Sequence, residues 1–318
     1  MRGTLLGALL LLSMVGALRG GIFPAEIRPE GMRSDRVGAI RILDQRELLF
    51  GAIDGRHFSE ISDLAFLPRK HWLFMISDEG RLFRFRARFG DKIRELEPRE
   101  ASEIRKKSGK RLKKWRRDSE GLTLDGKERL YASFEGRPRV ARLSYDGRIL
   151  RRLKLPPQIA KEKRMWRRNK GLEALTWHPR YGLVTAPEYP VRDASRKIQT
   201  LYSLSGRRWS YRRGGEPNSA ITALEVLANG NFLILERAYD GPLSPIVVTL
   251  RELQIDRCAG RRLCPTRVLA RFDSARGWAV ENFEGLARVG EDRFVMISDD
   301  NDNFFQKTVM VYFEVEGR

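Results

Sequence analysis

The chain has 318 residues and a formal net charge of +20, and it contains only two cysteines. The charge favours anionic partners, and no segment beyond the N-terminal leader is apolar enough to cross a bilayer, which excludes a multi-span membrane protein. The length exceeds that of a usual two-layer domain but suits a closed β architecture that folds as one unit.

Residues 1–17 have the composition of a secretory signal peptide. One basic residue precedes an uninterrupted apolar run, and small residues suited to cleavage follow up to Ala17. An uncleaved membrane anchor is the alternative, although the apolar run is short for a span. We therefore expect a periplasmic or secreted protein with no membrane span after cleavage, a leader segment over residues 18–35 and one domain over residues 36–318.

A motif of two apolar strands recurs five times. Each copy opens on a step similar to Glu-Gly-Leu and closes on an acidic residue, and the copies share the leucines Leu64, Leu122, Leu175, Leu224 and Leu286. The intervals of 58, 53, 49 and 62 residues between these leucines match a propeller blade and are too long for leucine-rich or ankyrin repeats.

Further alternating segments follow each copy, which brings each unit to four strands. The sequence thus predicts an all-β fold, a single β-propeller of five or six blades. Residues 36–50 resemble the outer hairpin at 139–153, whereas only one strand, at 308–315, follows the last copy. We expect the N- and C-terminal strands to share one blade and close the ring, which removes open sheet edges.

Two basic runs, residues 104–118 and 161–170, each precede the first strand of a copy. One interpretation is a pair of solvated, helical connectors. Another is nucleic-acid binding with Trp115 and Trp166 as stacking platforms. Export from the cell argues against nucleic acid as the partner.

The acidic residues of the repeats are expected to gather on one face, because the opening and closing residues of a tight hairpin lie at the same end. The opening acids are Glu120, Glu173 and Glu284, with Ser62 and Thr222 or Ala223 in the other two copies. The closing acids are Asp78 with Glu79, Glu135, Glu188, Glu236, and Asp299 with Asp300.

Carboxylates held close together repel one another unless protons or a cation offset the repulsion, and hard divalent ions take oxygen ligands. We expect a divalent metal, calcium in the first place, bound by Glu120, Glu135, Glu173, Glu188, Glu236, Glu284, Asp299 and Asp300. The catalytic candidates are Glu120, Glu284 and Asp299. A basic rim of Lys161, Arg168, Lys170 and Arg237 would hold a small phosphorylated substrate. For any single acid, capping a turn or pairing with an arginine is the alternative.

Other catalytic patterns are absent from the sequence. It contains no G-x-S-x-G elbow, no Walker loop and no dinucleotide fingerprint. His57, His71 and His178 have no metal-pair spacing. We expect His178 to be structural, with a general acid as the alternative, and a Ser119 nucleophile remains conceivable but unsupported.

The two cysteines, Cys258 and Cys264, lie close together in one loop and predict a disulfide in an exported chain. Closing so small a loop contributes roughly 2 kcal/mol in the entropic view, so the bond would pin a loop and not hold the fold. A zinc site is the alternative, but no histidines are near to complete its shell.

Several ordered motifs resemble one family. ISDLAF, SDEG, DSEGLTL, KGLEALTW, LILER, NFEGLARV and MISDDN look like the exported bacterial proteins named "esterase-like activity of phytase", over roughly residues 36–316. The resemblance implies a β-propeller distantly similar to calcium-dependent phytases, whose acids bind metal and phosphate on one face. Asp63 and Ala223 depart from the glycine of the motif, which argues against a fully symmetric metal ring.

The expected function is therefore metal-dependent hydrolysis of a phosphoester by a monomeric protein. A non-enzymatic propeller that is stabilised by calcium and binds a ligand or a cell-envelope partner is the alternative.

Overall fold

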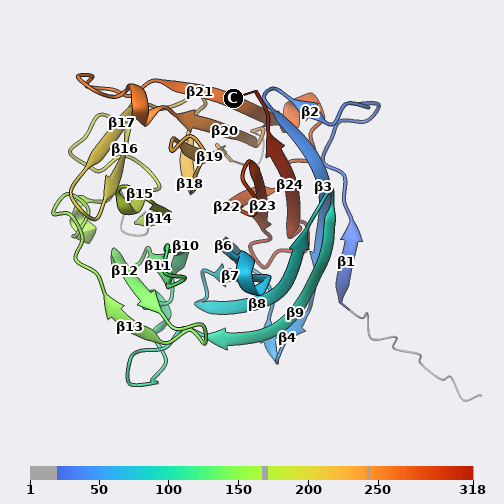
Figure 1. The fold of residues 1–318 in the computed structure, drawn as a ribbon, viewed down its shortest axis with the longest axis horizontal. Helices are drawn as coiled ribbons and strands as arrows, with labels where there is room; N and C mark the ends of the chain where they lie inside the picture. The colour runs from blue at the N-terminus through green and yellow to red at the C-terminus, as the bar shows by residue number, and fades with distance from the viewer. Residues whose placement is uncertain (1–19, 167–170, 242–243, 318) are drawn as a thin grey trace, which may run out of the picture.

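The computed structural model describes residues 20–166, 171–241 and 244–317. Within them the chain forms an all-β propeller of five blades, each an antiparallel sheet (Figure 1). The all-β propeller is confirmed, and of the two blade counts that the sequence allowed, five is correct. Figure 1 shows the sheets around a common axis, with the first strand of each of the five repeat copies innermost.

The first four blades follow one another along the chain, each with its strands in sequence order. Blade 1 contains β6 (Ile61–Leu67), β7 (Trp72–Ser77), β8 (Arg81–Phe89) and β9 (Ile93–Glu103). Blade 2 contains β10 (Ser119–Leu124), β11 (Leu130–Phe134), β12 (Arg139–Leu143) and β13 (Ile149–Arg152). Blade 3 contains β14 (Leu172–His178), β15 (Gly182–Pro187), β16 (Ile198–Ser203) and β17 (Arg208–Arg212). Blade 4 contains β18 (Ala220–Val226), β19 (Phe232–Ala238), β20 (Val247–Leu253) and β21 (Thr266–Asp273).

Blade 5 joins the two ends of the chain, as predicted. Its inner strands are β22 (Asn282–Arg288), β23 (Arg293–Asp299) and β24 (Val309–Val315), and β24 pairs antiparallel with β3 (Ile40–Leu49). Two short N-terminal strands, β1 (Gly21–Pro24) and β2 (Arg36–Val37), add to β3. The ring therefore closes through hydrogen bonds between strands far apart in the sequence.

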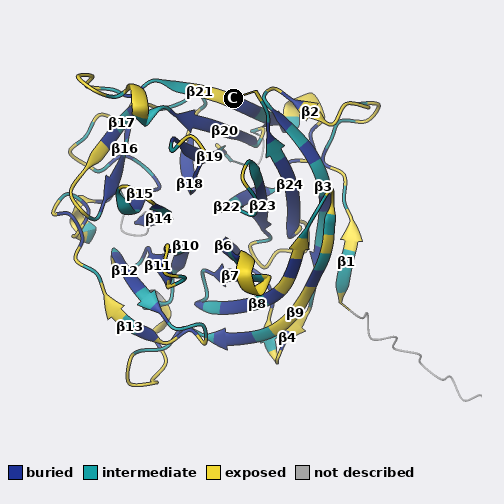
Figure 2. Cartoon of the chain, in the orientation of Figure 1, coloured by how far each residue is buried: buried dark blue, intermediate teal, exposed yellow. Residues whose placement is uncertain are grey.

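The core lies between the blades. The described residues form five buried apolar clusters, and each is shared by two neighbouring blades. The five repeated leucines are all at most 2% exposed, which explains why the leucine repeats in every copy. Figure 2 shows buried residues on the inner strands and exposed residues mainly on the loops and the outer strands.

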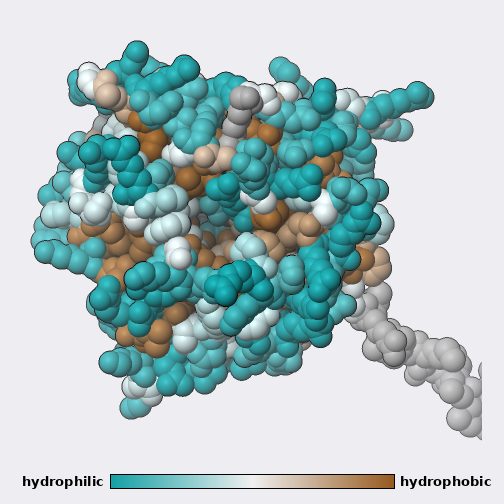
Figure 3. Space-filling view, in the orientation of Figure 1, coloured by the Kyte–Doolittle hydropathy of each residue, from teal (hydrophilic) through white to brown (hydrophobic). Residues whose placement is uncertain are grey.

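Two of the connectors between blades contain the basic runs of the sequence. Each basic run contains a single 3-10 turn, η2 (Lys114–Arg116) and η3 (Glu162–Arg164), so the expected helical connectors are reduced to one short turn each in the described residues. Three further 3-10 turns, η1 (Pro68–Lys70), η4 (Ile255–Arg257) and η5 (Ser274–Arg276), and a small hairpin of β4 (Ala52–Ile53) and β5 (Arg56–His57) complete the elements. Hydrophilic side chains cover most of the face in Figure 3, with apolar atoms showing between them.

Two further expectations concern the chain as a whole. Cys258 and Cys264 form a disulfide in the loop between β20 and β21, as predicted. The signal peptide predicted for residues 1–17 lies outside the described residues. In the described part of the chain, no helix has the length and apolar character needed to span a membrane.

Candidate functional site

The same hairpin register recurs in the two innermost strands of every blade, at the end opposite the turn that joins them. The last common pairs are Ile61–Ser77, Ser119–Phe134, Leu172–Pro187, Ile221–Glu236 and Phe283–Ser298. In each inner strand the register shifts directly after this pair, which marks a β-bulge. Bulges bend a strand and redirect a side chain, so this end of each hairpin can aim a residue toward the axis.

Two positions of each blade follow from this register. The bulge position holds Ser62, Glu120, Glu173, Thr222 and Glu284 in blades 1 to 5. The closing position, one residue beyond the last common pair on the second strand, holds Asp78, Glu135, Glu188, Arg237 and Asp299. Seven of these ten positions are acidic, and blade 4 is the blade without an acid at either one.

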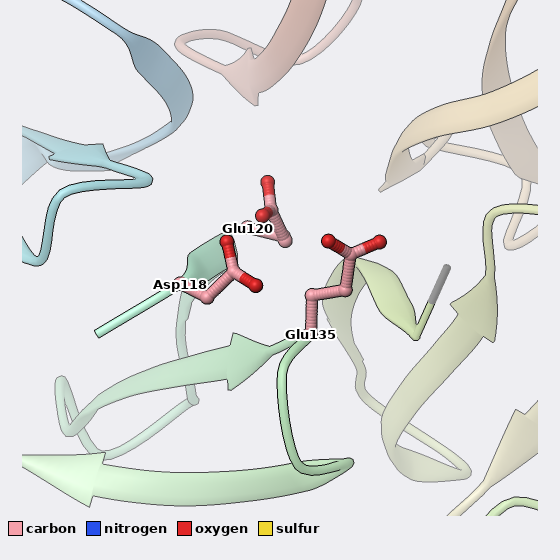
Figure 4. Close-up of side chains that lie close together, drawn as sticks. All are labelled: Asp118, Glu120 and Glu135. Atoms are coloured by element: carbon pink, nitrogen blue, oxygen red, sulfur yellow. The ribbon is translucent and has the colours of Figure 1, made fainter. Parts of the chain in front are cut away.

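The structure brings five carboxylates of blades 2 and 3 into two overlapping groups. Oxygen atoms of Asp118, Glu120 and Glu135 all lie within 4.8 Å of one another, as do oxygen atoms of Glu135, Glu173 and Glu188. Figure 4 shows the first group, with the three side chains reaching from the start of β10 and the end of β11 into a common space. Glu135 belongs to both groups and links them.

We call these five carboxylates, together with Asp78, Glu284 and Asp299, the acidic basin. Blades 1 and 5 contribute to it through electrostatic contacts: Glu120 interacts with Glu284, and Asp78 interacts with both Asp118 and Glu284. The basin therefore runs across the axis from blade 3 to blade 5.

Burial and mutual repulsion keep protons on several of these acids. Burial, followed by the charges of Glu173 and Glu135, raises the pKa of Glu120 well above its usual range. Burial, followed by Glu284, raises the pKa of Asp299 to about 9. Burial, followed by Glu60 and Asp118, raises the pKa of Asp78 to about 7. A cation in the basin would relieve the same repulsion that these protons relieve.

The donor set fits a hard divalent ion. Every ligand atom offered by the two groups is a carboxylate oxygen, and Ca²⁺ and Mg²⁺ prefer oxygen donors, whereas softer metals prefer nitrogen or sulfur. Asp118 also lies within hydrogen-bonding reach of Glu120 and Glu135. Carboxylates can share such contacts only through a proton or a cation. Blades 2 and 3 therefore provide the part of the basin best suited to a metal.

Arg237 is a cation of the chain that lies in the basin. Its Nη1 donates to Oε1 of Glu284 at 2.9 Å, and only 19% of its side chain is exposed. Burial acts to lower the pKa of Arg237, but the charges of Glu284, Glu188 and Glu173 raise it. The residue predicted to hold substrate from a basic rim thus pairs with an acid at the centre.

Glu236, which the sequence predicts as a metal ligand, lies outside the two carboxylate groups of the described residues. It pairs with Ile221, one residue before the closing position, and successive side chains of a strand point to opposite faces. Its two oxygens accept hydrogen bonds from Tyr211 Oη at 2.8 Å and Arg251 Nε at 2.9 Å. Glu236 is therefore a structural acid, 3% exposed.

Asp300 lies one residue beyond the closing position and serves the following turn. One of its oxygens accepts hydrogen bonds from the backbone N–H groups of Glu60 and Asp302, and the other accepts one from Thr308 Oγ1. Asp300 therefore caps the following turn, which is the alternative role that the sequence allowed for any single acid. It belongs to neither carboxylate group of the described residues.

Asp63 explains the departure from glycine in the first copy. Its carboxylate accepts hydrogen bonds from Leu122 N at 2.7 Å and Leu286 N at 2.9 Å, so it links the inner strands of blades 2 and 5 below the basin. The equivalent glycines allow close packing at the axis: a Cβ on Gly121 would lie 2.6 Å from Leu175 N, and one on Gly285 would lie 2.8 Å from Asp63 Cα. The inner strands thus touch beneath the carboxylates.

Two weaker candidates have structural roles. Ser119 Oγ donates to Ser77 O at 2.6 Å and is fully buried. His178 lies at the opposite end of β14 from Glu173, where Nε2 contacts Gly230 O at 2.9 Å and Nδ1 accepts from Arg180 N. Neither side chain faces the basin.

Of the expected basic rim, Arg168 and Lys170 lie outside the described residues. Lys161 lines a pocket beside blade 2, together with Arg139. Arg139 and Asp118 are the residues that sequence reasoning missed. Asp118 stands two positions before Glu120, a spacing that could have revealed it, whereas Arg139 starts an outer strand and carries no such signal.

Comparison with protein families matches residues 56–302 to the family Phytase-like, described as esterase-like activity of phytase. Comparison with curated proteins finds no match.

Proposed function

The chain belongs to the phytase-like family, and on that premise we propose that it is a metal-dependent hydrolase of phosphoesters. The single observation that carries the proposal is the convergence of five carboxylates of blades 2 and 3 within two overlapping groups. Such a donor set binds a hard divalent ion, and we propose calcium. When bound there, the ion would polarise phosphoryl oxygens and lower the pKa of a bound water.

The residues would divide the work by position. Asp118, Glu120, Glu135, Glu173 and Glu188 would hold the ion. Asp299 would carry a proton at neutral pH, because burial and the charge of Glu284 raise its pKa to about 9, and it could give that proton to the leaving alcohol oxygen. Glu284 would keep Arg237 oriented toward the basin through their 2.9 Å hydrogen bond.

The substrate we propose is a small anionic phosphoester. Arg237 inside the basin, and the cationic lining that includes Lys161 beside it, would attract and orient phosphate oxygens. We also propose that the protein acts outside the cytoplasm as a monomer. The signal-like residues 1–17 and the disulfide between Cys258 and Cys264 support export.

The test is hydrolysis by the purified protein. A phosphomonoester, a phosphodiester and a carboxyl ester with the same chromogenic alcohol would be offered with calcium, with magnesium or with chelator. We expect phosphoester cleavage that chelator abolishes, with a loss of about 100-fold or more in kcat/KM for Glu120→Gln and Glu284→Gln.

The control is Glu97→Gln, an acid-to-amide change on a side chain that is 56% exposed on β9. It should keep full activity. Absence of turnover in every condition, together with a large calcium-dependent rise in Tm, would contradict the enzyme and support the calcium-stabilised binding propeller instead.

A further inference from the structure

A pocket of about 830 Å³ lies at the outer edge of blade 2, toward blade 3. It occupies the same face as the acidic basin, because its lining residues Arg137 and Arg116 lie two positions from Glu135 and Asp118 in the chain. The volume is in the range of ordinary small-molecule sites. The family comparison says nothing of this pocket.

The pocket is strongly cationic. Of its twelve lining residues in the described chain, seven are Arg or Lys and one, Glu162, is acidic. Arg152 and Lys163 stand exposed at its mouth. Like charges gathered at this density repel one another, so an anion that enters the pocket lowers the free energy of the whole group.

Arg139 shows that the charge is built into the floor and is not only a feature of the surface. The residue is 8% exposed, and its guanidinium stacks on the Phe134 ring with 3.9 Å between Cζ and the ring centroid. Its Nη atoms donate to the carbonyl oxygens of Arg137 and Arg116, and within the described residues its Nε has no hydrogen-bond partner. Burial, followed by Arg152 and Arg116, lowers the pKa of Arg139 to about 9.

Keeping an arginine buried among other cations is costly, because burial already disfavours its charged form. No described carboxylate hydrogen-bonds to Arg139. The charge of Asp118 acts on Arg139 without such a bond, and a ligand with negative oxygen atoms would add a second counter-charge beside it.

The remaining lining is apolar. Pro138, Leu153, Leu155 and Ala160 belong to the same pocket as the cations. Inorganic phosphate would leave the apolar side chains exposed to water, and a neutral lipid would bring no negative charge to the cationic side chains. The two kinds of lining together select a molecule with a charged end and an apolar body.

We propose that this pocket binds an anionic amphiphile, a molecule with a phosphate-like head group on an apolar chain. The head group lies against Arg139 and Arg152, and the chain lies against Leu153 and Leu155. Binding here does not depend on the proposed hydrolysis, because the pocket contains none of the carboxylates of the basin.

Calorimetric titration tests the proposal without catalysis. The probe is octylphosphonate, whose carbon–phosphorus bond is not a substrate for a phosphoesterase, and chelator in the buffer prevents metal-bridged binding in the basin. We expect binding about tenfold or more tighter than that of inorganic phosphate, no binding of neutral octyl glucoside, and weakening at high salt. Equal affinity for phosphate and octylphosphonate, or no binding of octylphosphonate, would overturn the proposal.

Two variants locate the site. Arg152→Glu should weaken octylphosphonate binding about tenfold or more, whereas Arg151→Glu, on the adjacent exposed residue outside the lining, should change it by less than about twofold. Ala160→Glu, which places an acid in the pocket at an exposed position, should abolish binding with Tm unchanged. Equal losses in the two arginine variants, or full binding by the Ala160 variant, would show that the ligand binds elsewhere.

A last titration, with and without anionic vesicles, distinguishes a single amphiphile from a lipid surface as the source of the head group. Monomeric octylphosphonate should bind as tightly in their absence. Binding to vesicles alone, with none to the monomer, would contradict a pocket for a single amphiphile.

Discussion

Blades 2 and 4 have the same hairpin register but solve the problem of buried charge in opposite ways. Blade 2 presents Asp118, Glu120 and Glu135 to one space, where the charge of Arg139 in the same blade acts on Asp118. Blade 4 presents Arg237, which pairs with Glu284, and turns Glu236 away toward Arg251. The comparison teaches that blade 4 offsets its buried charge with ion pairs, whereas in blade 2 burial raises the pKa of Asp118 and Glu120, so that a proton or an added cation would stabilise them.

The largest expected effect is the pH dependence of stability that the acidic basin produces. Asp78 and Asp299 have pKa values raised to about 7 and about 9 from the unfolded value of 3.8. Because the folded state holds these protons more tightly, their contribution to stability is complete below pH 3.8 and is lost as the pH rises through 7 to 9.

We therefore expect the Tm in chelator to fall between about pH 5 and pH 9, and calcium to flatten that fall. Thermal unfolding across this range, with and without calcium, is the measurement. Parallel curves in the two buffers would show that the basin does not bind calcium in exchange for protons.

The next effect tests the internal cation. Arg237→Met should lower the free energy of unfolding by about 3–5 kcal/mol, because it leaves Glu284 without its partner in a mostly buried site. Arg251→Met removes the partner of Glu236 and should cost a similar amount. Denaturant unfolding should separate the two: calcium should restore much of the loss in the first variant and little in the second, since only Glu284 lies in the basin.

A third change removes one acid from blade 2. Glutamine imitates the protonated acid, so Glu120→Gln should raise the Tm in chelator at pH 8. It should also remove most of the calcium-dependent stabilisation, which for the unmodified protein is about 3 kcal/mol at a calcium concentration near 100 times Kd. A full calcium shift in this variant would place the metal elsewhere. Glu236→Gln is the matched control, because it should destabilise the protein and leave the calcium shift intact.

The fold was predictable because its signals are local and repeated. The recurring leucines, such as Leu122 and Leu175, mark the inner strand of each blade, and the surplus strand at the N-terminus matched the deficit at the C-terminus. Strand alternation and repeat period are properties of short windows, so a single sequence reveals them.

The site was less predictable because it depends on register. A difference of one residue moves a side chain to the other face of a strand, and at the end of β19 the acid and the base are neighbours, Glu236 and Arg237. The sequence-based prediction took Glu236 as the residue that faces the axis, whereas the structure has Arg237, the partner of Glu284, at that position. The partners of Glu236 come from β17 and β20, and no local pattern announces that Tyr211 and Arg251 meet there.

The smallest expected effect tests whether Glu236 is as structural as its contacts indicate. Tyr211→Phe removes the 2.8 Å hydrogen bond from the phenol to Oε1 of Glu236 and keeps the Arg251 contact to Oε2. One lost hydrogen bond to a charged acceptor should lower the free energy of unfolding by about 1–2 kcal/mol. Because this pair faces away from the basin, the calcium-dependent shift in Tm should equal that of the unmodified protein. A reduced shift would mean that blade 4 is coupled to the carboxylates of blade 2, and that the two halves of the ring are not independent.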